Sequence, residues 1–131
     1  MTATSEKTNA FLIHISALLG FIFPFGSILF PLLLWKAQKR TSNFLETNGT
    51  EAVNFNISFG FYRFTLITGL VISFFLVVLK HNTFGIFTLI GIYALFELMH
   101  SCLIILAAIK AQKGEKYEYP MTIKFLKQNP F

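Results

Sequence analysis

The sequence predicts an all-α, polytopic helical membrane protein, and three observations support this prediction. Hydrophobic residues make up 54% of the chain and include 17 Phe, more than a soluble core of this size can bury. Charged residues make up only 13%, against about a quarter in soluble domains. The apolar residues gather into three segments, about 11–35, 57–79 and 84–109, each long enough for a transmembrane helix. We therefore expect one transmembrane helical domain over residues 1–131.

The second and third segments are expected to form an antiparallel helical hairpin. The second begins near Glu51, whose carboxylate suits the first turn of a helix, and ends at the polar turn Lys80-His81-Asn82. The third continues beyond the membrane to Gly114, which favours a helix C-cap. The stretch 36–50 is polar and is expected to be a loop, in which Phe44-Leu45 reaches toward the membrane interface.

The first segment allows two arrangements because Pro24 and Pro31 interrupt it. Proline lacks an N–H and clashes with the preceding turn, so each proline is expected to kink or break a helix. The segment is then either one kinked span or two half-helices that form a re-entrant hairpin. Two complete spans are not expected, since each half would reach only about 18 Å. We favour the kinked single span.

The basic residues predict the orientation in the membrane. With three spans, Lys7 and Lys80 lie on one side, and eight basic residues lie on the other: Lys36, Lys39, Arg40, Lys110, Lys113, Lys116, Lys124 and Lys127. The positive-inside rule then predicts a multi-pass protein of the bacterial cytoplasmic (inner) membrane with a cytoplasmic C-terminus. The tail, 114–131, is expected to form a short amphipathic piece along the headgroups, or a docking strip for a partner.

Ionisable residues inside the apolar segments are the strongest candidates for function, because such groups are costly in lipid. Helix rise places Arg63 about 18 Å and Glu97 about 22 Å from the cytoplasmic side, so the two are expected to form an ion pair. The full intramembrane polar seam comprises Arg63, Glu97, His100, Asn54, Ser58 and His14. It is either a structural seam that joins the helices or a track for a proton, ion or substrate.

Chemical motifs are scarce in this sequence. Glu97 and His100 have the i, i+3 spacing of a di-metal ligand pair, but no second copy accompanies them, so no metal and no cofactor are expected. Nucleotide-binding loops and hydrolase motifs are missing from the sequence, and no catalytic residue is assigned. A single cysteine, Cys102, excludes an intramolecular disulfide. The basic residues flank apolar segments rather than form a stripe, which argues against nucleic-acid binding.

Several short motifs together resemble a known family. They are His14, Pro24, Pro31, Trp35, the run 51–56, the run 109–115 with Gly114, then Tyr117, Tyr119 and Pro120. The pattern resembles the uncharacterised bacterial membrane proteins of the Tic-twenty-like group, distantly similar to a chloroplast inner-envelope import component. One departure is that Asn48-Gly49-Thr50 replaces the His that the family often carries there. The resemblance implies a structural signature, and by analogy a translocon subunit.

Two functions remain open on the sequence. The first is a non-enzymatic integral membrane protein, a subunit of a larger transport or envelope assembly, whose partners are the lipid bilayer and either other membrane proteins or further copies of itself. Minimal extramembrane mass and a Phe-rich surface favour this hypothesis. The alternative is a small homo-oligomeric channel or carrier that uses the seam of Arg63, Glu97 and His100.

Overall fold

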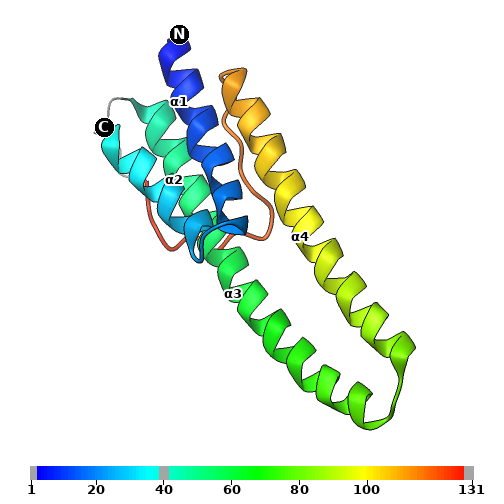
Figure 1. Cartoon of the computed structure of the whole chain (residues 1–131). Helices are drawn as coiled ribbons and strands as arrows, with labels where there is room; N and C mark the ends of the chain where they lie inside the picture. The colour runs from blue at the N-terminus through cyan, green and yellow to red at the C-terminus, as the bar shows by residue number, and fades with distance from the viewer. Residues whose placement is uncertain (1–2, 39–41, 129–131) are drawn as a thin grey trace.

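The architecture is a short helical bundle from which a long helical hairpin projects (Figure 1). A computed structural model describes residues 3–38 and 42–128, and the regular structure in these ranges is helical. The elements are α1 (Thr4–Ile15), the 3-10 helix η1 (Ser16–Phe21), α2 (Gly26–Ala37), α3 (Asn43–Leu79) and α4 (Thr83–Gln112). The chain from 115 to 128, called the strap below, runs back over the bundle without regular structure.

The described residues contain two helices long and apolar enough to cross a membrane, α3 and α4, and not the three spans that the sequence analysis predicted. Their most apolar windows have mean hydropathies of 2.0 and 2.1 and are 0% and 22% buried within the chain. The uncovered parts, about 60–79 of α3 and 83–99 of α4, are called the arms. An arm of 20 residues is about 30 Å long, which matches the hydrocarbon core of a bilayer.

The two arms form the antiparallel hairpin that the sequence predicted. Leu79 ends α3, and the Asn82 side chain caps α4 by accepting a hydrogen bond from the Gly85 backbone N–H at 3.2 Å. At the other end of α4, the predicted cap is confirmed: Gly114 has φ +86°, and its N–H donates to the Ala111 carbonyl at 2.9 Å. This left-handed residue follows the last turn of α4 and redirects the chain into the strap.

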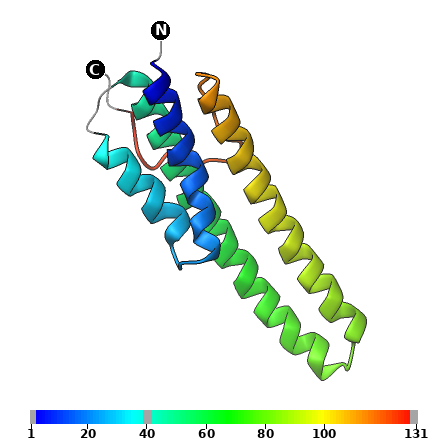
Figure 2. The ribbon, with the colours of Figure 1, turned by 45° about the horizontal axis from the view of Figure 1, so that its top comes forward.

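The prediction of a kinked single span for residues 11–35 was wrong, because this segment folds back on itself. Figures 1 and 2 both show α1 and α2 side by side and antiparallel, joined by a tight turn. Pro24 lies in that turn, where its missing N–H costs nothing. Gly20 lies so close to Ser27 that a Cβ would be 2.7 Å from the Ser27 Cβ, so the turn requires glycine. The structure therefore adopts the alternative arrangement, in which two half-helices form a hairpin.

Pro31 does not break the helix, so of the two prolines only Pro24 marks an interruption of the segment. Helix α2 runs from Gly26 to Ala37 with Pro31 buried inside it. The fold already reverses at Pro24, seven residues earlier, so a second break is not needed to reverse the direction of the chain. We find no local feature that offsets the missing donor at this position.

The prediction of a loop over residues 36–50 is also wrong for most of that range. Helix α3 begins at Asn43, and the Ser42 hydroxyl caps it by accepting from the Leu45 N–H at 3.2 Å. Phe44 and Leu45 therefore face the core of the bundle, not the membrane interface. The serine cap outweighs the polar composition that suggested a loop. Lys39 and Arg40, which the orientation prediction used, lie outside the described residues.

Small residues allow the bundle helices to pack closely. Ala10 on α1 and Ala107, Ala108 and Ala111 on α4 are fully buried. On the opposite side of α3, Trp35 of α2 lies against Gly49, and its indole N–H donates to Glu46 Oε2 at 3.1 Å. Close approach of this kind holds membrane helices together where the hydrophobic effect contributes little.

We predict that Gly49→Ala destabilises the protein, because a Cβ at this position would overlap the Trp35 indole ring. The expected loss is about 1–3 kcal/mol in the free energy of unfolding, as for other overpacked sites. Thermal unfolding in detergent micelles would measure it. The matched control is Gly69→Ala on the same helix, which meets nothing within 4 Å and should be neutral or stabilising. Equal effects of the two substitutions would contradict the packing argument.

Candidate functional site

Charged residues at the junction of bundle and arms form one hydrogen-bonded group. Arg63 on α3 donates from Nε to Oε1 of Glu97 on α4 at 2.6 Å, and from Nη2 to Oε2 at 2.9 Å. Bidentate pairing of this kind is among the strongest polar contacts in proteins. The structure therefore brings together the two residues whose matched depths suggested an ion pair.

His100, one turn beyond Glu97 on α4, extends this group. Its Nδ1 lies 3.2 Å from Arg63 Nη2, and its Nε2 lies 3.1 Å from Asn56 Oδ1. A guanidinium only donates, so Nδ1 accepts and carries no proton. The Asn56 amide N–H donates to the Ala52 carbonyl at 2.8 Å, which turns Oδ1 toward the ring, so Nε2 carries the proton. His100 is therefore neutral, and its 3.9 Å approach to Glu97 Oε2 is not an ion pair.

A cavity of about 320 Å³ lies between this group and the turn that joins α1 and α2. Gly20 and Pro24 line it from the hairpin, and Arg63, Tyr93 and Glu97 line it from the arms. The charges that face the cavity cancel, since one guanidinium is paired with one carboxylate. The arrangement suits a small polar or zwitterionic group better than a free cation.

His14 forms a second polar centre and does not reach the first. Its Nε2 lies 2.9 Å from Asn48 Oδ1, and its Nδ1 lies 2.8 Å from the Tyr119 hydroxyl in the strap. The Asn48 amide N–H donates to the Phe44 carbonyl at 2.9 Å, so Oδ1 faces the ring here as well. Burial lowers the pKa of His14 to about 4 and raises the pKa of Tyr119 well above its ordinary value. A neutral imidazole therefore accepts from a protonated phenol.

A column of stacked rings joins the two polar centres. Phe55 stacks on Tyr119 with centroids 3.8 Å apart and planes at 11°, and it also stacks on His100 at 5.4 Å. Phe59 stacks on His100 at 5.0 Å and on Phe96 at 5.4 Å. Both Phe55 and Phe59 are fully buried. The rings fix the orientation of the two polar centres relative to each other.

Two residues of the predicted seam bind the strap instead of the charged group. The Asn54 side chain accepts from the Leu126 N–H at 2.7 Å and donates to the Leu126 carbonyl at 2.9 Å. The Ser58 hydroxyl accepts from the Ile123 N–H at 2.8 Å. The described part of the tail is therefore not an amphipathic piece along the headgroups, because α3 holds its backbone by hydrogen bonds.

Four residues of the two polar centres were misplaced or missed by the sequence analysis. Tyr119 belongs to the tail that was expected along the headgroups, but it is only 5% exposed and lies at the centre of the bundle. Asn56 was missed, although it lies two helical turns before Arg63 and so shares its face. Tyr93 was missed too, one turn before Glu97. Asn48 was missed because residues 36–50 were predicted to be a loop, and a loop residue has no helical face that could be aligned with His14.

The carboxylates of the described chain are largely occupied by internal partners. Besides Glu97, Glu51 pairs with Lys124 of the strap and Glu115 pairs with Lys110 at 3.1 Å. One oxygen of Glu51, Oε2, is buried without a partner. Among the described residues no three His, Cys, Asp or Glu side chains are grouped as a metal site requires. Arg63 also occupies the face of Glu97 and His100 that a metal would need.

We predict that Glu97→Gln lowers the free energy of unfolding, because it leaves the Arg63 guanidinium without its counter-ion. The expected loss is about 2–3 kcal/mol, less than for a fully buried pair, since the Arg63 side chain is 26% exposed. Denaturant unfolding in detergent would measure it. Glu115→Gln breaks an exposed pair and should cost less than about 1 kcal/mol. A loss at Glu97 no larger than at Glu115 would contradict the role of the ion pair.

We also predict that Tyr119→Phe destabilises the bundle by about 1–2 kcal/mol, because His14 Nδ1 then stays buried without a donor. The matched control is Tyr117→Phe, whose ring packs edge-on against Tyr119 but whose hydroxyl does not contact His14. Thermal melting of both variants would separate the hydrogen bond from ring packing. The prediction fails if the two variants melt together.

Comparison with known proteins assigns the chain to a family. No curated protein and no solved structure matches it. Residues 5–126 match the model of the magnetosome magnetite crystal formation protein family, MamF/MmsF. This match covers nearly the whole chain and overturns the Tic-twenty-like resemblance, which was wrong. The translocon analogy is withdrawn with it. The chain belongs to the MamF/MmsF family of magnetosome membrane proteins.

Proposed function

We propose that this chain is a non-enzymatic subunit of a membrane assembly that takes part in magnetite crystal formation. The family supplies the process, since its description names magnetosomes and magnetite crystal formation. The structure supports the role of a subunit through one observation. The ionisable groups of the arms bond to one another inside the fold, while the outward faces of the arms are apolar and uncovered.

The arrangement of charges supports an action through the membrane and other proteins, and not through an acidic surface that collects iron. Iron sites in proteins use His and carboxylate ligands with open positions. Here the six carboxylates of the sequence are all Glu, and Glu46, Glu51, Glu97 and Glu115 contact partners within the fold. The formal net charge of +5 also repels free cations.

The alternative is a homo-oligomeric channel or carrier, and the cavity beside Arg63 and Glu97 is the observation that favours it. A carrier needs this pair to exchange partners during transport. A structural subunit needs the pair only for folding. The two hypotheses therefore differ in what Glu97→Gln does to protein that has folded.

We predict that deleting the gene in the bacterium that carries it changes the number or size of magnetite crystals seen by electron microscopy, and that the wild-type gene restores them. Complementation with Glu97→Gln should restore crystals in proportion to the amount of folded protein in the membrane. Unchanged crystals after deletion would contradict the proposed function.

One control variant completes this experiment. Glu115→Gln should restore crystals fully, because its ion pair is exposed. Normal amounts of folded Glu97→Gln protein with no restoration of crystals would favour the carrier instead.

Purification of the native protein in mild detergent should recover either a stoichiometric membrane partner or an oligomer. Recovery of a monomer alone would contradict the role of a subunit.

A further inference from the structure

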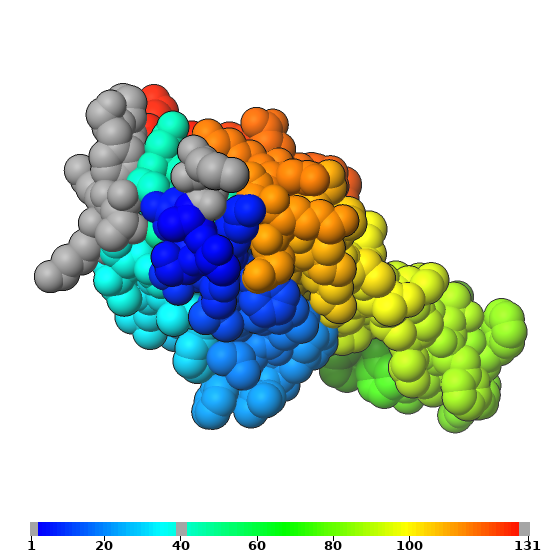
Figure 3. Space-filling model, turned by 90° about the horizontal axis from the view of Figure 1, so that it is seen from above, coloured from blue at the N-terminus to red at the C-terminus, as the bar shows by residue number. Residues whose placement is uncertain are grey.

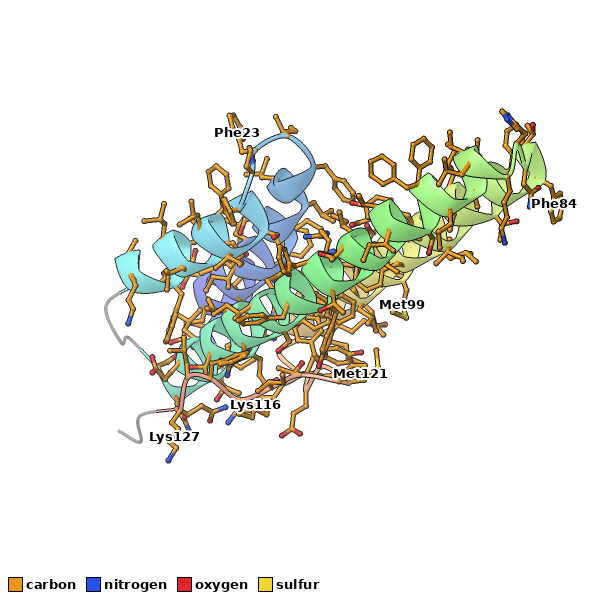
Figure 4. The ribbon with its side chains drawn as sticks, turned by 90° about the horizontal axis from the view of Figure 1, so that it is seen from below. Phe23, Phe84, Met99, Lys116, Met121 and Lys127 are labelled. Carbon is orange, nitrogen blue, oxygen red and sulfur yellow. The ribbon has the colours of Figure 1, made fainter. Side chains whose placement is uncertain are left out.

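The turn between α1 and α2 presents an apolar tip that the rest of the chain does not cover. Four large side chains in this turn, Phe21, Ile22, Phe23 and Phe25, are between 54% and 76% exposed. The sequence from 15 to 35 contains no Asp, Glu, Lys or Arg. Figure 4 shows Phe23 at the end of the hairpin, pointing away from α3 and α4. A tip with these side chains belongs in lipid.

The length of the hairpin limits how deep this tip can lie. Helix α2 has 12 residues and is about 18 Å long, so the hairpin cannot cross a hydrocarbon core of about 30 Å. The tip shares a cavity with Arg63, and the 16 residues from there to Leu79 rise about 24 Å. With Leu79 at the far boundary, the tip lies about 6 Å below the near one. Amphipathic segments that act on one leaflet insert to this depth.

The cross-section of the molecule therefore differs between the two leaflets. On the near side lie α1, α2, α3, α4 and the strap, whereas on the far side only the two arms remain (Figures 1 and 2). Seen from the bundle end, the arms leave from one edge of a much broader body (Figure 3). Each helix is about 10 Å across with its side chains, so four helices occupy about twice the area of two. Such a shape is a wedge.

Charge reinforces this asymmetry. Lys116 and Lys127 of the strap lie at the broad end, and Lys36 ends α2 there, with its ammonium 4.4 Å from the centre of the Trp35 ring. The far end carries Lys80. Lysines at the broad end attract anionic headgroups, each by about 1 kcal/mol near the surface. The broad end is therefore built for the surface of one leaflet.

We propose that this chain binds preferentially to curved membranes, with the hairpin tip wedged into the convex leaflet and the arms anchored through both leaflets. The exposed tip is covered by lipid, in a leaflet rich in anionic headgroups. The inference rests on the shape of the chain and holds or fails apart from the proposed role in magnetite formation.

The test reconstitutes the full-length protein, fluorescently labelled, into single vesicles of mixed diameter with anionic and zwitterionic lipids. Trypsin cleavage after the strap lysines identifies molecules whose broad end faces outward, and only these are counted. We expect roughly a two-fold or greater rise in protein density from the largest to the smallest vesicles. Density independent of diameter would overturn the proposal.

A matched pair of variants assigns the effect to the tip. Phe23→Gln combined with Phe25→Asn removes the apolar tip, and Asn suits the left-handed backbone at Phe25, where φ is +61°. Phe84→Gln is the control, since Phe84 is 80% exposed at the far end of the arms. The tip variant should lose the preference for small vesicles and the control should keep it. An unchanged preference in the tip variant, or an equal loss of preference in the Phe84→Gln control, would overturn the proposal.

Discussion

The fold depends on one constraint: the polar side chains on the first half of α3 are buried, and each requires a hydrogen-bond partner. Asn48 meets this requirement with α1, Asn56 with α4, and Asn54 and Ser58 with the strap. These contacts join segments 34 to 72 residues apart in sequence. Helix α3 therefore acts as the scaffold to which α1, α2, α4 and the strap are hydrogen-bonded. Apolar packing fills the space between these contacts.

The same hydrogen-bonding arrangement of an asparagine and a histidine occurs twice along α3. An asparagine donates to the carbonyl one turn back and accepts from the Nε2 of a neutral histidine, at Asn48 with His14 and at Asn56 with His100. In both cases the second ring nitrogen accepts, once from a tyrosine and once from an arginine. A neutral imidazole donates one hydrogen bond and accepts another, so it joins two polar groups without the cost of a buried charge. This explains how a chain with little polar surface retains two buried histidines.

Function and shape follow from where these polar contacts stop. Beyond Arg63 and Glu97 the arms carry apolar outward faces, and the chain can continue only into lipid. The bundle ends at the same level, where the hairpin tip turns back. One boundary therefore separates a broad, polar-cored part from a narrow, apolar part. The proposed roles as a membrane subunit in crystal formation and as a wedge in curved bilayers both use this division.

Local pattern in the sequence determined the helical class, the two arms, the turn at 80–82, the cap at Gly114 and the pairing of Arg63 with Glu97. Each of these depends on residues close along one helix or on two helices joined by a short turn, so periodicity and rise were sufficient. Only the tertiary structure decided that residues 11–35 fold back, that α3 begins at Asn43 and that the tail docks as a strap. Tyr119 meets His14 across 105 residues. No local pattern encodes such a contact, because it exists only once α3 has brought both ends of the chain to the same core.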